Sequence, residues 1–236
     1  MRLIRTGVVC LIAAAAIAMA GASAASAEPE FLTKVVVPEG SKIPFTATLS
    51  AAFLEGSQTK AKISCTGGSG GGEVTGPKSV GSDVTTFTGC KSGELPCSSA
   101  GAPAETIVTK TLKGVLGGVT TSLPGVRLFS QSEGRGGILA EFECGAGIAK
   151  VVVSGSVIGS LSGAAGTNPE TGKILTSGKL TFTETAGTQK YTKFVQGEAG
   201  SEQLTATING SSELSGQSVI ATLKTVPSTW GLGVTK

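Results

Sequence analysis

Glu141 and Glu143 are the pair of side chains whose type and spacing come nearest to a reaction centre. Residues two apart on a β-strand point the same way and lie roughly 6 to 7 Å apart, a separation compatible with the paired carboxyl groups of glycoside hydrolysis. The same spacing arises on any strand that faces solvent, and inward-pointing Phe142 and Cys144 favour that exposed arrangement. The sequence therefore predicts no catalytic residue, and a secreted hydrolase using Glu141 and Glu143 is kept as an alternative.

Other patterns that support catalysis or ligand binding are weak. The chain has no histidine, which excludes imidazole bases, triads and metal ligands of that type. Gly67–Gly71 matches the G-x-S-x-G nucleophile elbow only inside a glycine run, so a flexible hairpin loop is predicted there. Asp83 is the only aspartate, whereas calcium sites usually need several such carboxylates. No cofactor and no metal ion is predicted.

Four cysteines follow the N-terminal segment, at Cys65, Cys90, Cys97 and Cys144. In an oxidising compartment an even number predicts two disulfides, for which three pairings are possible. Cys65 and Cys144 each continue the inward face of a strand, whereas Cys97 lies in a turn-like stretch. We therefore predict a buried Cys65–Cys144 disulfide and a local Cys90–Cys97 disulfide. A four-thiolate zinc site is disfavoured, because the cysteines lack the paired short spacings of such sites.

The elements that position these residues are predicted to be strands. Glycine, serine, threonine, valine and alanine dominate the composition, which favours strands and turns over helices. About a dozen strands with short turns predict an all-β fold, an antiparallel β-sandwich or barrel. Most of the eight phenylalanines fall on inward phases. The predicted strands are 31–37, 45–55, 59–65, 83–89, 106–112, 126–129, 138–144, 149–158, 179–184, 190–195, 203–208 and 218–226.

The first 27 residues have the pattern of an export signal. Two arginines give a basic start, Val8–Ala20 is a short apolar run, and Ala25–Ala27 supplies small residues for cleavage. A retained anchor needs roughly 20 predominantly apolar residues, which is longer than this run. We expect residues 1–27 to be removed and residues 28–236 to form a single all-β extracellular domain without a membrane span.

The charge of the expected mature chain argues against nucleic acid as a partner. Removal of Arg2 and Arg5 leaves 17 basic and 16 acidic side chains. The lysines are scattered singly and form no basic stripe, which is the first feature expected of a nucleic-acid-binding surface. The expected partner is an unidentified extracellular or envelope component.

Several short stretches between Ile63 and about Ser160 carry a resemblance. They are Ile63–Cys65, Gly72–Lys78, Phe87–Cys90, Cys97–Gly101, Ile107, Leu112–Gly114, Ala140–Gly145 and Gly155–Gly159. With them the chain resembles a group of exported, cysteine-braced, β-rich proteins of unknown function from high-GC Gram-positive bacteria. The matching part is under half of the chain but includes Cys65, Cys90, Cys97 and Cys144. The resemblance implies a shared cysteine-braced β core and no particular activity.

Three functions remain open from the sequence. The first is a non-catalytic, secreted interaction or structural module of the extracellular space or cell envelope, predicted from the export signal and the lack of an assembled reaction centre. The second is the hydrolase based on Glu141 and Glu143. The third is a carrier that holds an apolar ligand inside a barrel. A filled core favours the module, a cleft with both glutamates at its floor favours the hydrolase, and a hollow apolar interior favours the carrier.

Overall fold

The computed structural model describes residues 28–32, 42–163, 174–175, 177–226 and 232–234, and these residues contain strands and no helix. The strands, in chain order, are β1 (Phe31–Leu32), β2 (Ile43–Leu49), β3 (Ala52–Gly56), β4 (Lys62–Cys65), β5 (Gly67–Gly76), β6 (Ser79–Thr88), β7 (Lys91–Ser92), β8 (Leu95–Ser98), β9 (Thr106–Val108), β10 (Leu112–Gly118), β11 (Pro124–Ser130), β12 (Ile138–Cys144), β13 (Ala149–Gly163), β14 (Ile174–Leu175), β15 (Ser177–Phe182), β16 (Glu184–Thr185), β17 (Thr188–Gln189), β18 (Leu204–Ile208), β19 (Ser211–Thr225) and β20 (Leu232–Val234).

The strands close into two rings of hydrogen-bonded neighbours that share the long strands β13 and β19. The first ring contains β2, β5, β6, β10, β11, β13, β15 and β19 and closes where β10 pairs with β6. The second ring contains β3, β4, β7, β8, β12, β13, β18 and β19. Every pairing is antiparallel, so the predicted all-β antiparallel fold with about a dozen strands and two disulfides is confirmed.

Strand β13 passes from one ring to the other at Gly155. The residues before it pair with β12 and β18, and Ser156–Ser160 pair with β11. Gly155 has a φ of +103°, and a Cβ at this position would lie 2.1 Å from the carbonyl oxygen of Gln203. Glycine is required here because other residues rarely adopt this φ and no side-chain atom fits against Gln203.

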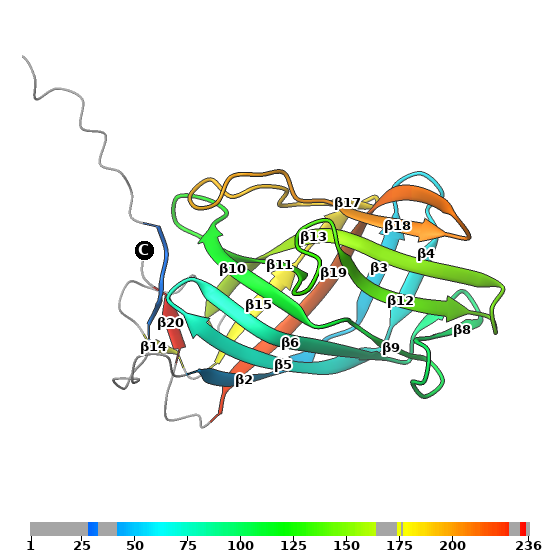
Figure 1. Ribbon diagram of the computed structural model, residues 1–236, viewed down its shortest axis with the longest axis horizontal. Coiled ribbons are helices and arrows are strands. Elements are labelled where there is room, and N and C mark those ends of the chain that lie inside the picture. Colours follow the sequence, from blue (N-terminus) through cyan, green and yellow to red (C-terminus); the bar gives the residue numbers. More distant parts are fainter. Residues whose placement is uncertain (1–27, 33–41, 164–173, 176, 227–231, 235–236) are drawn as a thin grey trace, which may run out of the picture.

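The two ends of the molecule are built differently (Figure 1). Strands β1, β20 and β14 form a separate small sheet at one end, and β8 lies near the other. The backbone N–H of Phe31 in β1 donates a hydrogen bond of 2.6 Å to the carbonyl of Pro77, in the turn between β5 and β6. This contact fixes β1 against the first ring.

The predicted strands are accurate where apolar residues on the inward face alternate clearly with polar residues on the outward face. For example, β12 has the predicted bounds, with Ala140, Phe142 and Cys144 buried and Glu141 and Glu143 exposed. The prediction for residues 31–37 is confirmed only for β1, since residues 33–37 lie outside the described part of the chain.

Several segments differ from their predictions. The predicted strand 45–55 is divided into β2 and β3, and 106–112 into β9 and the start of β10. Gly67–Gly71 is not a hairpin loop but the first half of β5, which pairs with β2 on one side and β6 on the other. Glycine has a low intrinsic preference for strands, and here pairing with two neighbours overrides that preference. Residues 190–195 are not a strand; they begin the connection between β17 and β18, where Phe194 packs with Val119 and Ile158 on the outside of the first ring.

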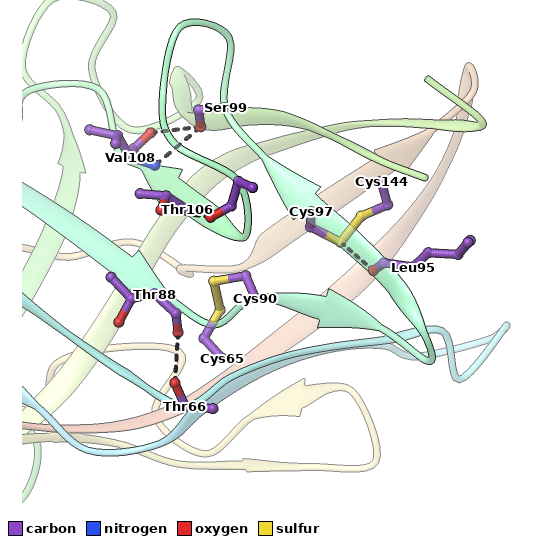
Figure 2. Close-up of a disulfide and its surroundings, with 11 residues drawn as sticks. Cys65, Thr66, Thr88, Cys90, Leu95, Cys97, Ser99, Thr106, Val108 and Cys144 are labelled. Atoms are coloured by element: carbon purple, nitrogen blue, oxygen red, sulfur yellow. Dashed lines mark hydrogen bonds between the residues drawn. A yellow bond between two sulfur atoms is a disulfide. The ribbon is translucent and has the colours of Figure 1, made fainter. Parts of the chain in front are cut away.

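The predicted disulfide pairing is wrong. The structure contains Cys65–Cys90 and Cys97–Cys144, which lie close together near β8 (Figure 2). The error came from treating the stretch that contains Cys97 as a turn.

Residues 91–98 instead form the hairpin β7–β8, which occupies the place between β4 and β12 in the second ring. Cys97 on β8 is the direct cross-strand partner of Cys144 on β12. On the other side, Lys91 follows Cys90 and pairs with Ser64, the residue before Cys65. Each disulfide therefore fastens one side of this short hairpin to its neighbouring strand. Because all four sulfurs are in disulfides, they do not form a zinc site.

Candidate functional site

The interior of the rings is the most distinctive candidate site, because it contains an apolar cavity of about 180 Å³. Its lining comes from strands of both rings and is dominated by aliphatic side chains and phenylalanine rings. The phenylalanines are Phe31, Phe45, Phe53, Phe87, Phe142 and Phe182. This placement confirms the prediction that most phenylalanines of the chain face inward.

The space arises because β5 contributes few side chains to the first ring. Three inward positions on β2, at Phe45, Ala47 and Leu49, have Gly72, Gly70 and Gly68 as their cross-strand partners. A Cβ at Gly68 would lie 2.3 Å from the carbonyl oxygen of Thr86 on β6. The glycine run therefore allows β5 to approach β6 closely and leaves this side of the interior without side chains.

Asp83 is the one acidic residue that lines the cavity. Asp83 has the inward phase of Thr85 and Phe87, which also line the cavity. A bulge adjoins it in β6: Gly81 to Val84 spans three residue steps opposite two steps on β5, and Ser82 within the bulge has a φ of +53°. The extra residue reverses the alternation of β6, so that Val80 and Asp83 are both buried whereas Ser82 is exposed.

The carboxyl group of Asp83 is isolated from polar neighbours. The residue is 7% exposed, and burial raises its pKa to about 6. In the part of the chain that the structure describes, no other residue forms an ion pair or side-chain hydrogen bond with this carboxyl group. An acidic group that stays unpaired in apolar surroundings is unusual, because burial of its charge is costly.

A second polar group lies in the same row of cross-strand neighbours. Thr225 on β19 pairs with Phe45, Phe45 pairs with Gly72, and the Cβ position of Gly72 is 3.0 Å from the Cα of Asp83. The Thr225 Oγ1 is buried and has no hydrogen-bond partner among the described residues. Lys224, next to it, is the exposed member of the cavity lining.

The glutamates considered for catalysis lie elsewhere. Glu141 and Glu143 are on the outer face of β12, with the Glu141 carboxylate 2.7 Å from the Lys110 Nζ and the Glu143 carboxylate 3.6 Å from the Lys150 Nζ. Neither glutamate lines the interior cavity. The spacing expected from the strand is therefore present, but the apolar pocket that would tune one of these groups as an acid is not beside them.

A buried ion cluster on the outside of the first ring holds the connection between β17 and β18. Arg127 on β11 is fully buried; its Nε lies 2.9 Å from Glu202 without hydrogen-bond alignment, and its Nη1 lies 3.1 Å from Glu198. Glu198 also pairs with Arg135, and the Arg127 guanidinium lies 4.7 Å from the centre of the Phe194 ring. Burial lowers the pKa of Arg127 and the two glutamates oppose that change. The cluster fastens this connection to the ring.

Sequence reasoning missed Asp83 as a site residue. Alternation through Thr85 gives Asp83 the same inward phase as Phe87, but the predicted strand 83–89 begins at this residue, whereas β6 starts at Ser79. The bulge at Ser82 lets β6 extend beyond Asp83 with Val80 also buried.

Comparison with known proteins adds no relative: no family model, no curated protein and no solved structure matches this chain. Among the described residues, no helix is long and apolar enough to cross a membrane. The two disulfides are compatible with an oxidising, extracellular environment.

Proposed function

We propose that this protein is a secreted, non-catalytic carrier that holds a small apolar ligand inside its ring of strands. The apolar cavity of about 180 Å³ is the observation that supports this function. Of the three functions left open by the sequence, the carrier is the one that requires a hollow apolar interior.

The size of the cavity limits the ligand. An engineered protein cavity of about 150 Å³ with an apolar lining binds benzene, and pockets for drug-sized molecules usually exceed about 300 Å³. The volume of this cavity lies between these two values, and it fits a ligand with a single ring or a short hydrocarbon chain.

The other two functions have less support. An interaction module needs no interior space, and the hydrolase needs Glu141 and Glu143 in a cleft, whereas both are exposed and face lysines. A carrier of this kind is compatible with the extracellular or envelope location expected from the sequence.

Export is part of the proposal. Residues 1–27 have the pattern of a cleaved signal, and the disulfides are of the kind that persist outside the cytoplasm. Mass spectrometry of the protein from culture medium should find an N-terminus near Glu28. Recovery of the protein only from the cell interior, with free thiols at Cys65 and Cys144, would contradict export.

The carrier function is tested by filling the cavity. Ala47 faces the interior between Leu223 and Gly70, whereas Ala51 is exposed in the break between β2 and β3. Toluene binding should be measured by titration calorimetry for the wild type, Ala47→Leu and the matched control Ala51→Leu, with circular dichroism to verify folding.

We expect toluene to bind the wild type and Ala51→Leu equally, and Ala47→Leu at least about tenfold more weakly, because the leucine occupies the ligand's space. Absence of binding to the wild type, or unchanged binding to folded Ala47→Leu, would contradict the proposal.

A further inference from the structure

We infer that the ligand of this interior site carries a positively charged amine on its apolar body, with the Asp83 carboxylate as its counter-ion. This inference rests on the proposed carrier function and names the class of ligand. It is carried by the position of Asp83, whose carboxyl group is 7% exposed and lies on the inward face of β6 in a cavity with a mostly apolar lining.

Among the residues that the structure describes, none supplies a cation for this carboxylate. Lys224 is the basic residue in the cavity lining, but its side chain is exposed and contributes nothing to the pKa of Asp83. Leu112 on β10 and Gly72 on β5 are the neighbours of Asp83 across the two adjacent strands. Neither carries a polar side chain, so these neighbours do not offset the charge, whereas an ammonium group on a ligand would.

The surroundings suit an ammonium group attached to an apolar body. A charge-assisted hydrogen bond to Asp83 is stronger than one between neutral groups, and the unpartnered Thr225 hydroxyl lies three strands away in the same row. Phe45 lies between these two polar groups, and aromatic rings attract cations. The aliphatic lining beyond this row is suited to the hydrocarbon part of the ligand.

Binding of such a ligand depends on pH. Burial raises the pKa of Asp83 to about 6, so the carboxyl is ionised above this pH and neutral below it. The charged groups on the elements packed against β6 face outward: Glu73 on β5 pairs with Lys42, and Lys113 on β10 lies over the Phe129 ring. With Lys224 exposed on β19, Asp83 is the group in the cavity that titrates in this range.

The experiment compares benzylamine with toluene, which has the same ring without the amine. Both are titrated by calorimetry into the full mature protein, into Asp83→Asn, and into Glu143→Gln as a control that removes an exposed carboxylate. At about pH 8 we expect Asp83→Asn to bind benzylamine at least about tenfold more weakly than the wild type, because the charge-assisted bond is lost. Toluene binding should change less than about twofold, and Glu143→Gln should match the wild type.

The pH dependence of the wild type gives an independent measurement that does not need a variant to fold. Benzylamine stays protonated from about pH 8 to about pH 4.5, so its affinity should fall as Asp83 takes up a proton, while toluene affinity should not. Equal benzylamine binding by the wild type and Asp83→Asn, or a flat pH profile, would overturn the inference. If toluene still binds when the inference is overturned, the carrier function is unaffected. If neither toluene nor benzylamine binds, the carrier function itself is contradicted.

Discussion

The carboxylate of Glu213 on β19 holds the turn between β3 and β4 by accepting hydrogen bonds from Thr59. Its Oε2 accepts the backbone N–H of Thr59 at 2.9 Å and that of Gln58 at 2.7 Å, and its Oε1 accepts the Thr59 hydroxyl. The hydrogen bond from the Thr59 hydroxyl is the main cause that lowers the pKa of Glu213. This contact ties residues far apart in the sequence at one end of the second ring.

Replacement of Glu213 should therefore weaken the fold. We expect Glu213→Gln to lower the free energy of unfolding by about 1 to 3 kcal/mol at neutral pH, because an amide cannot accept all these hydrogen bonds. Urea denaturation followed by circular dichroism measures this change. Glu94→Gln, in the exposed turn between β7 and β8, is the matched control and should have little effect.

The contribution of Glu213 also has a defined pH dependence. Since its pKa is lower in the folded state than in the unfolded state, the stabilisation is complete above about pH 4.5 and is lost as the pH falls through the folded value. The difference in unfolding free energy between wild type and Glu213→Gln should shrink below about pH 4.5. A constant difference down to acid pH would contradict this role.

Asp83 should affect stability in the opposite direction. Its pKa is about 6 in the folded protein against 3.8 ordinarily, so the folded state binds more protons between these values and the free energy of unfolding falls as pH rises. A shift of this size corresponds to roughly 3 kcal/mol. The free energy of unfolding of the wild type and of Asp83→Asn is measured by urea denaturation at several pH values. The difference between the two should change by about 3 kcal/mol from about pH 4 to about pH 7. A pH-independent difference would place the Asp83 carboxyl in solvent.

The Arg127 cluster provides a test of the connection between β17 and β18. Glu202 is 1% exposed and Arg127 is fully buried, whereas the Glu198 side chain is about half exposed. Loss of one partner from a buried ion pair leaves an uncompensated charge, so Glu202→Gln should lower the free energy of unfolding by about 3 kcal/mol or more. Glu198→Gln should cost about 1 kcal/mol or less. Equal effects of the two substitutions would show that burial does not determine the strength of these pairs.

The two disulfides should each stabilise the short hairpin β7–β8 within the second ring. Loops of 25 and 47 residues correspond to about 3 to 4 kcal/mol each in the chain-entropy model. Removal of either pair, as Cys65→Ala with Cys90→Ala or as Cys97→Ala with Cys144→Ala, should lower the free energy of unfolding by up to this amount. Peptide mapping without reduction should recover Cys65 linked to Cys90, and a Cys65–Cys144 fragment would contradict this connectivity.

Much of the fold follows from local patterns in the sequence. Alternation along β12 correctly predicts which side chains face the core, because burial on one side of a strand repeats every second residue. Strand-forming residues and turn residues likewise predict an all-β antiparallel fold. These features depend on neighbours in the sequence, which is why sequence reasoning finds them.

The features that define the site depend on contacts between distant strands. The glycine run of β5 reads as a loop until β2 and β6 pair with it, and Cys97 reads as a turn residue until β8 is placed opposite β12. Asp83 has the inward phase of Phe87, but the bulge at Ser82 that extends the strand beyond it has no clear signature in the sequence. The cavity and its carboxyl group therefore emerge only from the folded chain.

A crystal structure of the protein soaked with toluene tests the central claim most directly. The account predicts electron density for one toluene molecule inside the first ring, in contact with Ala47 and Leu180 and close to the row that contains Phe45 and Asp83. An interior filled by repacked side chains, or toluene bound only on the outer surface of the strands, would contradict it.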